Sequence, residues 1–425
     1  MSKASCARSS GRDTKTPTKT IVQKYGGTSV GSVELIQRVA EKVAAVRQRG
    51  DRIAVVVSAM GDHTDRLVDL AAGIAHEPNP REMDVLLSTG EQVSIALLAM
   101  ALCERGIPAR SFTGSQVRVR TTNVHRRARI TEVEVERLQT SLNAGEVPVV
   151  AGFQGIDDDG DITTIGRGGS DTSAVALAVA LKADECQILT DVDGVYTTDP
   201  RLVSDARLLR QISFEEMLEL AGQGSRVLHL RSVEFAAKYN VPLRVLSSFR
   251  PGPGTLICKE DPLVEAPLIS GIAFNRDEAQ ITVSGLPDTP ECVARVLKPI
   301  SGANIEVDMI VLASGRDGLK DLSFTVHRDD FLEAQRLTRN MTAEFAGSRM
   351  TADATVAKLA VVGVGMRSHA GVATQLFESL ARQGVKALLI STSEIKIAVL
   401  VPETALESCV KCLHEDLGLS SRYEG

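Results

Sequence analysis

Aromatic side chains are scarce in this chain. Trp is absent, and Phe, Trp and Tyr together make up 3% of the 425 residues. Proteins that bind single-stranded nucleic acid stack bases on aromatic side chains, so a surface of that kind is not expected. Positive charge is not in excess either, because the formal net charge is -6. Such a chain does not attract polyanions as a whole, and we expect no nucleic acid partner.

Paired cysteines and long apolar runs are also missing. The seven Cys residues are an odd and scattered set, which fits a reducing cytoplasm better than a disulfide framework. Cys409 and Cys412 form a C-x-x-C pair in the amphipathic stretch Ala405–Leu417, with no second pair nearby. We therefore predict two helical thiols rather than a zinc or redox site. No apolar run is long enough to span a membrane, so no membrane partner is expected.

The amino terminus lacks the apolar segment of a secretory signal. Residues Met1–Lys19 are rich in Ser, Thr, Lys and Arg. They resemble an organellar transit peptide weakly, but the prediction is a disordered tail over residues 1–19. With the cysteine usage, this composition predicts a cytoplasmic protein.

From Thr20 onward, the chain contains an alternation of buried strands and helices. Its length is too great for one ordinary domain, so two or three are expected. Strands are predicted at Ile21–Gln23, Ile53–Val57, Val147–Phe153 and Gln187–Thr190. Helical periodicity lies between them, with the longest stretch over Met83–Arg105 and Gly90 as its candidate break point. This order predicts α/β layering around a largely parallel sheet.

The order of predicted strands and helices changes after the turn Pro251–Gly254, where a repeat begins. A strand, a turn, a helix and a strand are predicted between Ile281 and Val311, and the same order recurs from Leu359, about 78 residues later. Two small βαββαβ units account for this period. The expected organisation is a tail over residues 1–19, an α/β domain over 20–265, and two α+β modules over 266–345 and 346–425.

Glycine-rich loops follow several strands of the first domain. They contain Gly26–Gly27, Gly61 and Gly166–Gly169, each beside a charged or hydroxyl residue. Glycine allows close backbone approach, and N–H groups at helix N-termini bind phosphates. No loop matches G-x-x-x-x-G-K-[ST], so a P-loop is excluded.

These loops carry a resemblance to aspartate kinases. The segment Lys24–Gly31 (KYGGTSVG) is similar to the opening signature of that family. Further motifs follow in the family's order: Ser58–Gly61 (SAMG), Ser88–Glu91 (STGE), Gly166–Thr172 (GRGGSDT) and Thr190–Arg201 (TDVDGVYTTDPR). The resemblance spans about Thr20 to Leu419, and the C-terminal repeats look like the family's paired ACT modules. It implies an open αβα sandwich, the amino-acid kinase fold, followed by two ACT-like modules.

The resemblance also implies site residues. Those of catalysis are Lys24, Asp171 and Arg167. Those that bind ATP are Lys24, Tyr25, Gly26, Gly27, Ser58, Ser170, Thr190, Asp191, Tyr196, Asp199, Arg201 and Arg226. Those that bind L-aspartate are Thr64, Glu91, Arg167, Gly168, Gly169 and Ser170. The family usually has Lys where Arg226 stands, so charge is kept on a bulkier planar group.

Physical chemistry supports these roles. The aspartate side chain has a pKa near ~3.9, so it is an anion at pH 7 and needs no general base. Catalysis then depends on positioning and on positive charge, for which Lys24 is the candidate. Arg167 suits the substrate's α-carboxylate and Glu91 its α-ammonium, although both could be ordinary surface ion pairs. Asp171 could also be only a helix N-cap. Mg²⁺ is expected on the phosphates, with no carboxylate cluster dedicated to it.

The C-terminal modules depart from the family at positions that bind effectors. Glu291 stands after Asp288–Pro290 where the family has Gly, Leu312–Ala313 replaces Gln-Asn, and Lys386–Leu388 replaces an Asn-containing strand start. The residues that still match are Asp288, Asn304, Ser368, His369, Ser391, Thr392 and Glu394. We therefore expect weakened inhibition by lysine and threonine, with the modules serving a homodimer.

Two other functions compete with this interpretation. The chain could be another enzyme of the amino-acid kinase fold, acting on glutamate, carbamate or a nucleotide. It could also be a catalytically dead amino-acid sensor on the same scaffold. Retention of Lys24, Arg167 and Asp171 argues against the sensor. The reaction expected of an aspartate kinase is the first step toward amino acids such as lysine, threonine and methionine.

Overall fold

A mostly parallel sheet of eight strands organises the N-terminal domain (residues 20–258) in this computed structural model, which describes residues 18–225, 227–260, 269–364 and 370–420. Its strand order is β10 (Gln211–Ser213), β12 (Thr255–Cys258), β11 (Leu243–Ser247), β9 (Glu185–Thr190), β1 (Thr20–Tyr25), β2 (Arg52–Val57), β6 (Val147–Ala151) and β3 (Ala109–Phe112). Only the pairing of β11 with β12 is antiparallel. The central strands are buried on both faces, as their runs of Val and Ile require.

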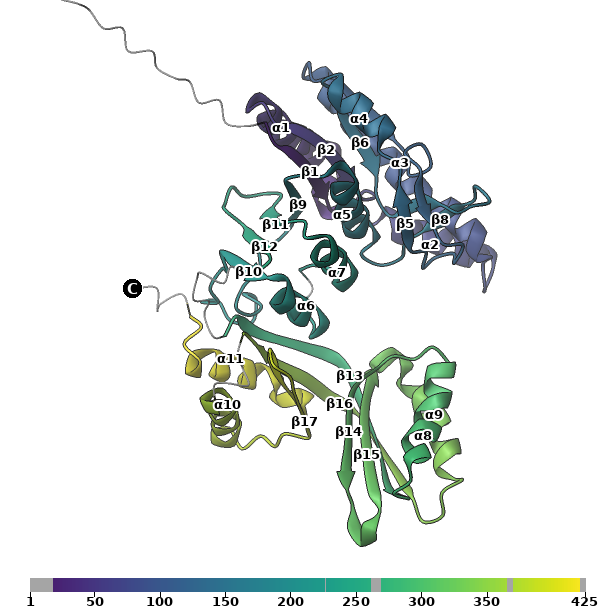
Figure 1. The fold of residues 1–425 in the computed structure, drawn as a ribbon, viewed down its shortest axis with the longest axis vertical. Coiled ribbons are helices and arrows are strands. Elements are labelled where there is room, and N and C mark those ends of the chain that lie inside the picture. Colours follow the sequence, from purple (N-terminus) through teal and green to yellow (C-terminus); the bar gives the residue numbers. More distant parts are fainter. Residues whose placement is uncertain (1–17, 226, 261–268, 365–369, 421–425) are drawn as a thin grey trace, which may run out of the picture.

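Helices cover both faces of this sheet (Figure 1). One core forms between the sheet and α1 (Val33–Gln48) and α3 (Pro80–Glu104). The other forms against α4 (Glu136–Asn143), α5 (Gly169–Leu181), α6 (Phe214–Gly222) and α7 (Leu230–Tyr239). A small sheet, β5 (Ile130–Val133), β4 (Val119–Thr121), β7 (Gln154–Ile156) and β8 (Ile162–Thr164), and α2 (His63–Ile74) complete the domain. The predicted αβα sandwich is confirmed.

Helix α3 differs from expectation in two ways. It runs without interruption through Gly90, where a Cβ would lie 2.8 Å from the Cβ of Ala59. The glycine therefore allows a close approach and does not break the helix. By length and composition alone α3 could also cross a membrane, contrary to the sequence expectation. Half of its most apolar window is buried in the domain, and the carboxyl side chains of Asp84 and Glu91 are buried with it.

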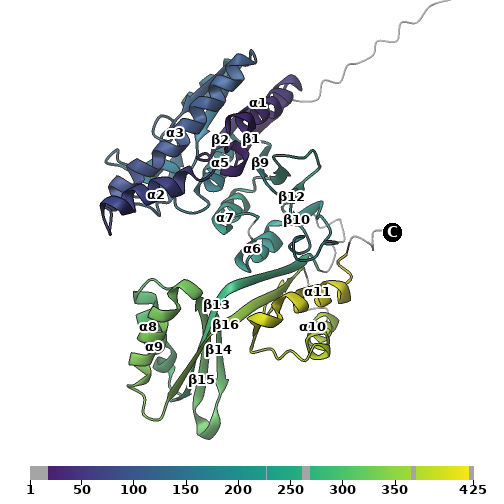
Figure 2. The same ribbon diagram turned by 180° about the vertical axis from the view of Figure 1, so that it is seen from behind.

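The C-terminal part forms one six-stranded sheet rather than two separate ones. Its order is β14 (Val307–Ser314), β15 (Lys320–His327), β13 (Gly271–Leu286), β16 (Arg349–Val362), β18 (Lys396–Pro402) and β17 (Leu389–Thr392). Helices α8 (Pro290–Gly302) and α9 (Phe331–Thr342) cover one half, and α10 (Ala370–Arg382) and α11 (Leu406–Asp416) cover the other. Both views show these two helix pairs on either side of the long strands β13 and β16 (Figure 2).

The strand pairing interleaves the two modules. The first part of β13, from Gly271 to Asn275, pairs with Lys358–Val362 of β16, and the second part pairs with the beginning of β16. The second module is thus completed by the first part of β13, which lies at the start of the predicted first module. A simple tandem of residues 266–345 and 346–425 does not describe this pairing, because sequence periodicity cannot reveal which strand completes a sheet. The boundaries themselves remain predictions.

Candidate active site

The predicted phosphate-binding loops meet at one edge of the N-terminal sheet. Lys24 lies at the end of β1, Ser58 follows β2, and Thr190 ends β9. These strands are parallel neighbours, so their carboxyl ends share one edge. The main-chain N–H of Ser58 donates a hydrogen bond to the carbonyl of Tyr25 at 3.1 Å, which connects the ends of β2 and β1. The fold therefore brings the sequence motifs together, as expected for an open α/β sheet.

Lys24 and Asp171 form an ion pair at this edge. The Lys24 Nζ lies 2.6 Å from Asp171 Oδ1, and the two side chains are 11% and 13% exposed. Asp171 sits in the first turn of α5, whose N-cap is Gly168. The interpretation of Asp171 as a capping residue is therefore wrong, because the cap position belongs to a glycine three residues earlier. Its carboxylate forms the ion pair with Lys24.

The glycines of two loops are required by close packing. A Cβ on Gly27 would lie 2.9 Å from the carbonyl oxygen of Ala59. Gly168 has φ +70°, and a Cβ there would lie 2.2 Å from Cγ of His229. Gly169 and Ser170 are buried at the start of α5. These loops can approach a ligand with their main chains because no side chain intervenes.

Glu91 is a buried carboxylate with one unsatisfied oxygen. It is 3% exposed, and its Oε1 accepts a hydrogen bond from the N–H of Ala59 at 3.1 Å. Its Oε2 has no partner among the described residues. Burial raises the pKa of Glu91 to about 8. A buried oxygen without a partner costs free energy, so this position is prepared for a cationic or hydrogen-bonding ligand.

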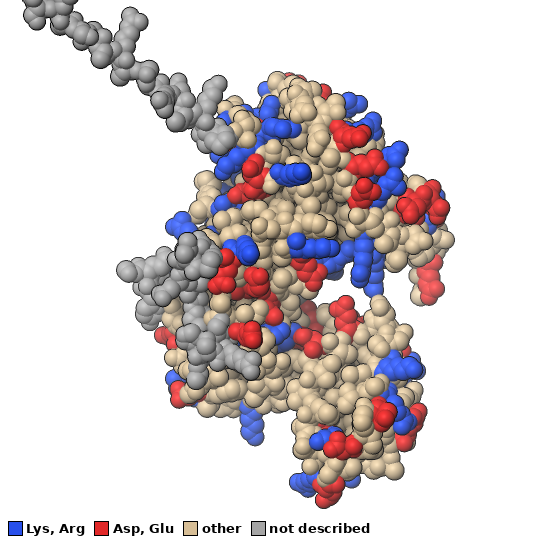
Figure 3. Space-filling model, in the orientation of Figure 1, with Lys and Arg blue, Asp and Glu red and all other residues tan. Residues whose placement is uncertain are grey.

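Arg167 and Thr64 are less constrained than Glu91. Arg167 is exposed in the loop before Gly168, and no ion pair engages it within the described residues. Thr64 is half-buried in the first turn of α2. Lys and Arg side chains gather along the margin of the N-terminal domain that overhangs a hollow in the molecular surface (Figure 3). Positive charge there suits anionic substrates.

A cavity of about 640 Å³ lies beside the predicted nucleotide loop. Thr190 Oγ1 donates to Asp191 (3.1 Å), and the Tyr196 hydroxyl donates to Asp193 (3.3 Å). The loop is further tied by an Asp199–Arg201 ion pair of 2.9 Å. The predicted residues Thr190, Asp191, Tyr196, Asp199 and Arg201 all line this cavity.

Other cavity residues were not identified from the sequence. Asp193 pairs with Arg250 at 2.9 Å, and its Oδ1 has no partner within the described part of the chain. Thr198 is 5% exposed, and its hydroxyl is also unpartnered among the residues described. Residues Ile272–Arg276 of β13 form another wall. Asp193 and Thr198 lie inside the motif and could have been proposed, whereas Arg250 and β13 carry no sequence signal.

The predicted nucleotide contact at Tyr25 is contradicted. Tyr25 is fully buried in the core, and its hydroxyl donates to Gln23 Oε1 at 3.0 Å. Burial raises the pKa of this phenol above its usual value. A strand that is buried on both faces explains the difference, since its alternate side chains enter a core and not the site. Arg226, Ser368 and His369 lie outside the described residues, so the predictions made for them are unaffected.

The predicted effector residues do not converge within one chain. Asp288 and Asn304 are both exposed and flank opposite ends of α8, a helix of 13 residues that is roughly 20 Å long at 1.5 Å per residue. Asp288 lies 3.3 Å from Lys320 in an ion pair. Ser391, Thr392 and Glu394 belong to the other module, at the end of β17.

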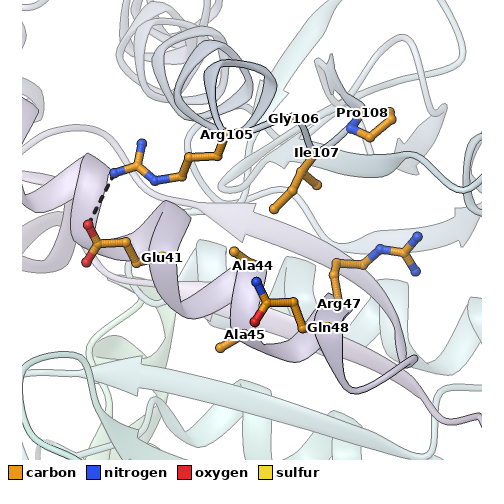
Figure 4. Close-up of a pocket in the computed structure, with 9 residues that line it drawn as sticks. All are labelled: Glu41, Ala44, Ala45, Arg47, Gln48, Arg105, Gly106, Ile107 and Pro108. Atoms are coloured by element: carbon orange, nitrogen blue, oxygen red, sulfur yellow. Dashed lines mark hydrogen bonds and ion pairs between the residues drawn. The ribbon is translucent and has the colours of Figure 1, made fainter.

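A second cavity, of about 590 Å³, lies at the opposite edge of the N-terminal sheet. Its walls come from the end of α1 and the turn between α3 and β3, including Arg47 and Pro108 (Figure 4). Glu41 and Arg105 at its rim pair with each other at 3.3 Å. It borders the amino ends of the strands and shares no residue with the loops described above.

Comparison with known proteins assigns the family. The amino acid kinase family model matches residues 19–247, and an ACT domain model matches residues 359–417. An aspartate kinase of Pseudomonas fluorescens is 59% identical over 397 residues, covering 93% of this chain and 96% of that protein. An aspartokinase of Pseudomonas aeruginosa is 58% identical over 93% of this chain and 96% of its own length. The chain belongs to the amino acid kinase family and, within it, to the aspartate kinases.

Solved structures agree with this assignment. E. coli aspartokinase III in complex with aspartate and ADP, in the R-state, has a TM-score of 0.81 and 28% identity, covering 94% of this chain and 100% of that one. The same enzyme with lysine and aspartate, in the T-state, has a TM-score of 0.75 and 29% identity, with 94% and 99% covered. The fold is that of an aspartokinase from the first strand to the last module.

Proposed function

We propose that the edge formed by β1, β2 and β9 is where this aspartate kinase transfers the γ-phosphoryl group of ATP to the side-chain carboxylate of L-aspartate. In this reaction a carboxylate oxygen forms a bond to the γ-phosphorus. The bond from that phosphorus to the β–γ bridging oxygen breaks, and ADP leaves with the electron pair. No proton has to be removed from the nucleophile, because a free carboxylate is ionised at neutral pH.

Lys24 is proposed to neutralise charge on the transferred group. Two anions must approach each other, so the main barrier is electrostatic. The ion pair with Asp171 holds the ammonium in place before substrates arrive. The main chains of Gly26, Gly27 and Gly168 can approach the phosphates closely. The nucleotide itself is assigned to the cavity that the loop from Thr190 to Arg201 lines.

The aspartate site is proposed around Glu91, Arg167 and Thr64, with Gly168, Gly169 and Ser170 beside them. The unpartnered Oε2 of Glu91 is the observation that carries this assignment. An α-ammonium group would satisfy it and favour the ionised form of Glu91, whose pKa burial raises to about 8. Arg167 is free to pair with the α-carboxylate in a bidentate way.

Mg²⁺ is proposed to bind mainly to phosphate oxygens and water. Among the described residues, no group of three His, Cys, Asp or Glu side chains could hold a metal ion. The carboxylate of Asp171 is paired with Lys24. This donor set fits an ion that keeps several waters and is carried by the nucleotide. The ion would supply charge neutralisation between the phosphates.

A hydroxylamine trapping assay tests the proposal. With ATP, Mg²⁺ and hydroxylamine, aspartate gives aspartyl hydroxamate, and glutamate, carbamate or a nucleoside monophosphate in its place gives no acyl or phosphoryl product. Glu91→Gln and Arg167→Ala should raise the KM for aspartate far more than the KM for ATP. A folded chain without turnover would point to the amino-acid sensor. Turnover of one of the other acceptors would point to a different enzyme of the fold.

The C-terminal sheet is proposed to form a homodimer. Strands β14 and β17 are its edges, and large apolar side chains there are exposed, including Ile310 (50%), Leu312 (51%) and Ile390 (46%). Unpaired edge strands with apolar side chains are surfaces that association covers. Static light scattering at micromolar concentration should give twice the chain mass, and Leu312→Lys should reduce it. A monomeric wild type would contradict the proposal.

The remaining assignments follow from the sequence. We place the catalytic domain at residues 20–265 and the modules at 266–345 and 346–425, with the second completed by β13. Cys103, Cys186, Cys292, Cys409 and Cys412 are free thiols, which supports a cytoplasmic enzyme. Lysine and threonine are proposed as weak effectors, because the changed positions remove hydrogen bonds and Glu291 repels a ligand carboxylate.

A further inference from the structure

Thr197 is a fully buried residue at which the nucleotide loop meets the C-terminal part of the chain. Its hydroxyl lies 2.9 Å from His414 Nε2 of α11 and 3.3 Å from the carbonyl oxygen of Leu419. The main-chain N–H of Arg207 donates to the same hydroxyl at 3.0 Å. A hydroxyl has one donor and two acceptor positions. All three are used.

These partners fix the direction of each hydrogen bond. The carbonyl of Leu419 can only accept, so the Thr197 hydroxyl donates to it. The N–H of Arg207 can only donate, which leaves the second acceptor position for His414. The imidazole therefore donates from Nε2 to Thr197. Burial lowers the pKa of His414. Asp205 raises this pKa and Arg207 lowers it, both to smaller extents. A neutral imidazole with one N–H is sufficient to donate this hydrogen bond.

The main chain of Thr197 is hydrogen-bonded as well. Its carbonyl accepts from the N–H of Ile272 in β13 at 2.7 Å, and its N–H donates to Arg207 at 2.9 Å. A Cβ on Gly271 would lie 2.6 Å from the Thr197 carbonyl oxygen. Figures 1 and 2 both show α11 and the start of β13 below β10 and β12, at the lower end of the N-terminal domain. Elements of the ACT modules thus clamp a residue of the catalytic domain.

The neighbours of Thr197 face the nucleotide cavity. Tyr196 and Thr198, which precede and follow Thr197 in the sequence, both line this cavity. Residues Ile272–Arg276 form another of its walls. Thr198 is nearly buried, and its hydroxyl lacks a partner among the described residues. A shift of Thr197 would move both neighbours, because adjacent Cα atoms are fixed about 3.8 Å apart.

We propose that His414 is a positioning residue for the nucleotide and acts through Thr197. This inference rests on the placement of ATP in the cavity proposed above. Loss of the His414–Thr197 hydrogen bond loosens the segment Tyr196–Thr198 and weakens binding of the nucleoside triphosphate. The aspartate site lies around Glu91 and Arg167, on other elements, and is unaffected. The second ACT module then contributes to catalysis by setting the affinity for ATP.

The test compares variants that remove or retain the hydrogen bond. His414→Leu and Thr197→Val remove it. His414→Gln and Thr197→Ser retain a donor and an acceptor near the original positions. We expect the first pair to raise the KM for ATP and the dissociation constant of ADP about 2- to 10-fold, the range of one net hydrogen bond. The KM for aspartate should change less than about 2-fold, and the second pair should be close to wild type.

Two controls separate positioning from general damage. Cys409→Ala changes a buried residue of the same helix that packs in the module core without touching Thr197, and it should leave the KM for ATP unchanged. The double variant His414→Leu/Thr197→Val should have a KM for ATP no higher than that of either single variant, because both substitutions remove the same interaction. Equal changes in both KM values, the same effect in Cys409→Ala, or an unchanged KM for ATP would each overturn the inference. Wild-type turnover of aspartate with ATP in the same assays tests the proposed function separately.

Discussion

Among the described residues two lysines are buried, one in each half, and their surroundings differ. Lys24 pairs with Asp171 at a strand end, next to the glycine loop at Gly26. Lys358 lies within β16, is 2% exposed, and pairs with both Glu278 (3.2 Å) and Asp308. Glu278 also accepts from Asn275 Nδ2 at 3.0 Å.

The comparison teaches that burial of a charge does not by itself indicate function. The charge of Lys358 is satisfied within the sheet, at the point where the paired strands β13 and β16 change register. Among the described residues the charge of Lys24 is paired with Asp171 alone, at the sheet edge where the glycine-rich loops meet. Buried charges that are fully compensated serve the structure, whereas incompletely compensated ones indicate a place for a ligand.

The largest expected effect is on stability, at Lys358. Lys358→Met leaves Glu278 buried without its cation, which typically costs about 3–5 kcal/mol. We expect the midpoint of urea unfolding to fall strongly, while kcat per folded molecule stays near wild type. Lys396→Met is a matched control in the same sheet, because its pair with Glu219 (2.9 Å) is more exposed and should contribute at most about 1 kcal/mol. Equal losses in both variants would remove the distinction.

The next largest effect is on the rate, at Lys24. Lys24→Ala should lower kcat by about 10²–10³ because it removes charge neutralisation in the transition state. Circular dichroism should show an intact fold. Lys238→Ala, on the surface of α7, serves as the control and should keep its rate. Near-normal turnover in folded Lys24→Ala protein would exclude Lys24 from the mechanism.

Glu91 gives a smaller effect that depends on pH. The aspartate ammonium needs the ionised carboxylate, and the pKa of Glu91 is raised to about 8. The KM for aspartate should therefore fall as the pH rises from 6 to 8, and the KM for ATP should not. In Glu91→Gln this slope should disappear, with a KM about 10- to 100-fold higher, as expected for a lost hydrogen bond to a charged group. A slope that persists in the variant would assign it to another group.

The same raised pKa has a consequence for the stability of the unliganded protein. Between the ordinary value of 4.5 and about 8, the folded state retains a proton at Glu91 that the unfolded state has lost. The free energy of unfolding contributed by this group therefore decreases as the pH rises through that window. Glu91→Gln should lose this contribution to the pH dependence, so its Tm relative to wild type should increase from pH 5 to pH 8.

The smallest expected effect is inhibition by amino acids. Each lost hydrogen bond to a charged effector is worth about 1.5–3 kcal/mol, and several family positions are changed here. Initial rates with lysine, threonine or both at millimolar concentration should decline little. Strong inhibition at sub-millimolar concentration would mean that other residues of the modules, such as Lys386, bind the effector.

The sequence alone determined the fold class and most of the catalytic edge. The β-branched runs of β2 and β6 predicted buried strands, and the loops after neighbouring parallel strands were expected to meet because such strands share an edge. The motifs therefore predicted that Lys24, Glu91 and Asp171 belong to one site, and the Lys24–Asp171 ion pair brings two of them together. The same pattern misplaced Tyr25, since a strand with two buried faces does not reveal which side chain reaches a ligand.

Only the tertiary structure decided how the two halves share their parts. The pairing of β13 with β16 joins residues 271–275 to residues 358–362, and no local pattern encodes a partner so distant in sequence. The contact of His414 with Thr197 spans 217 positions and depends on α11 docking against the nucleotide loop. Local periodicity predicts which residues are buried, but it does not predict which residues they pack against. The hydrophobic effect is non-directional, so the packing partners depend on how the shapes of distant segments fit together.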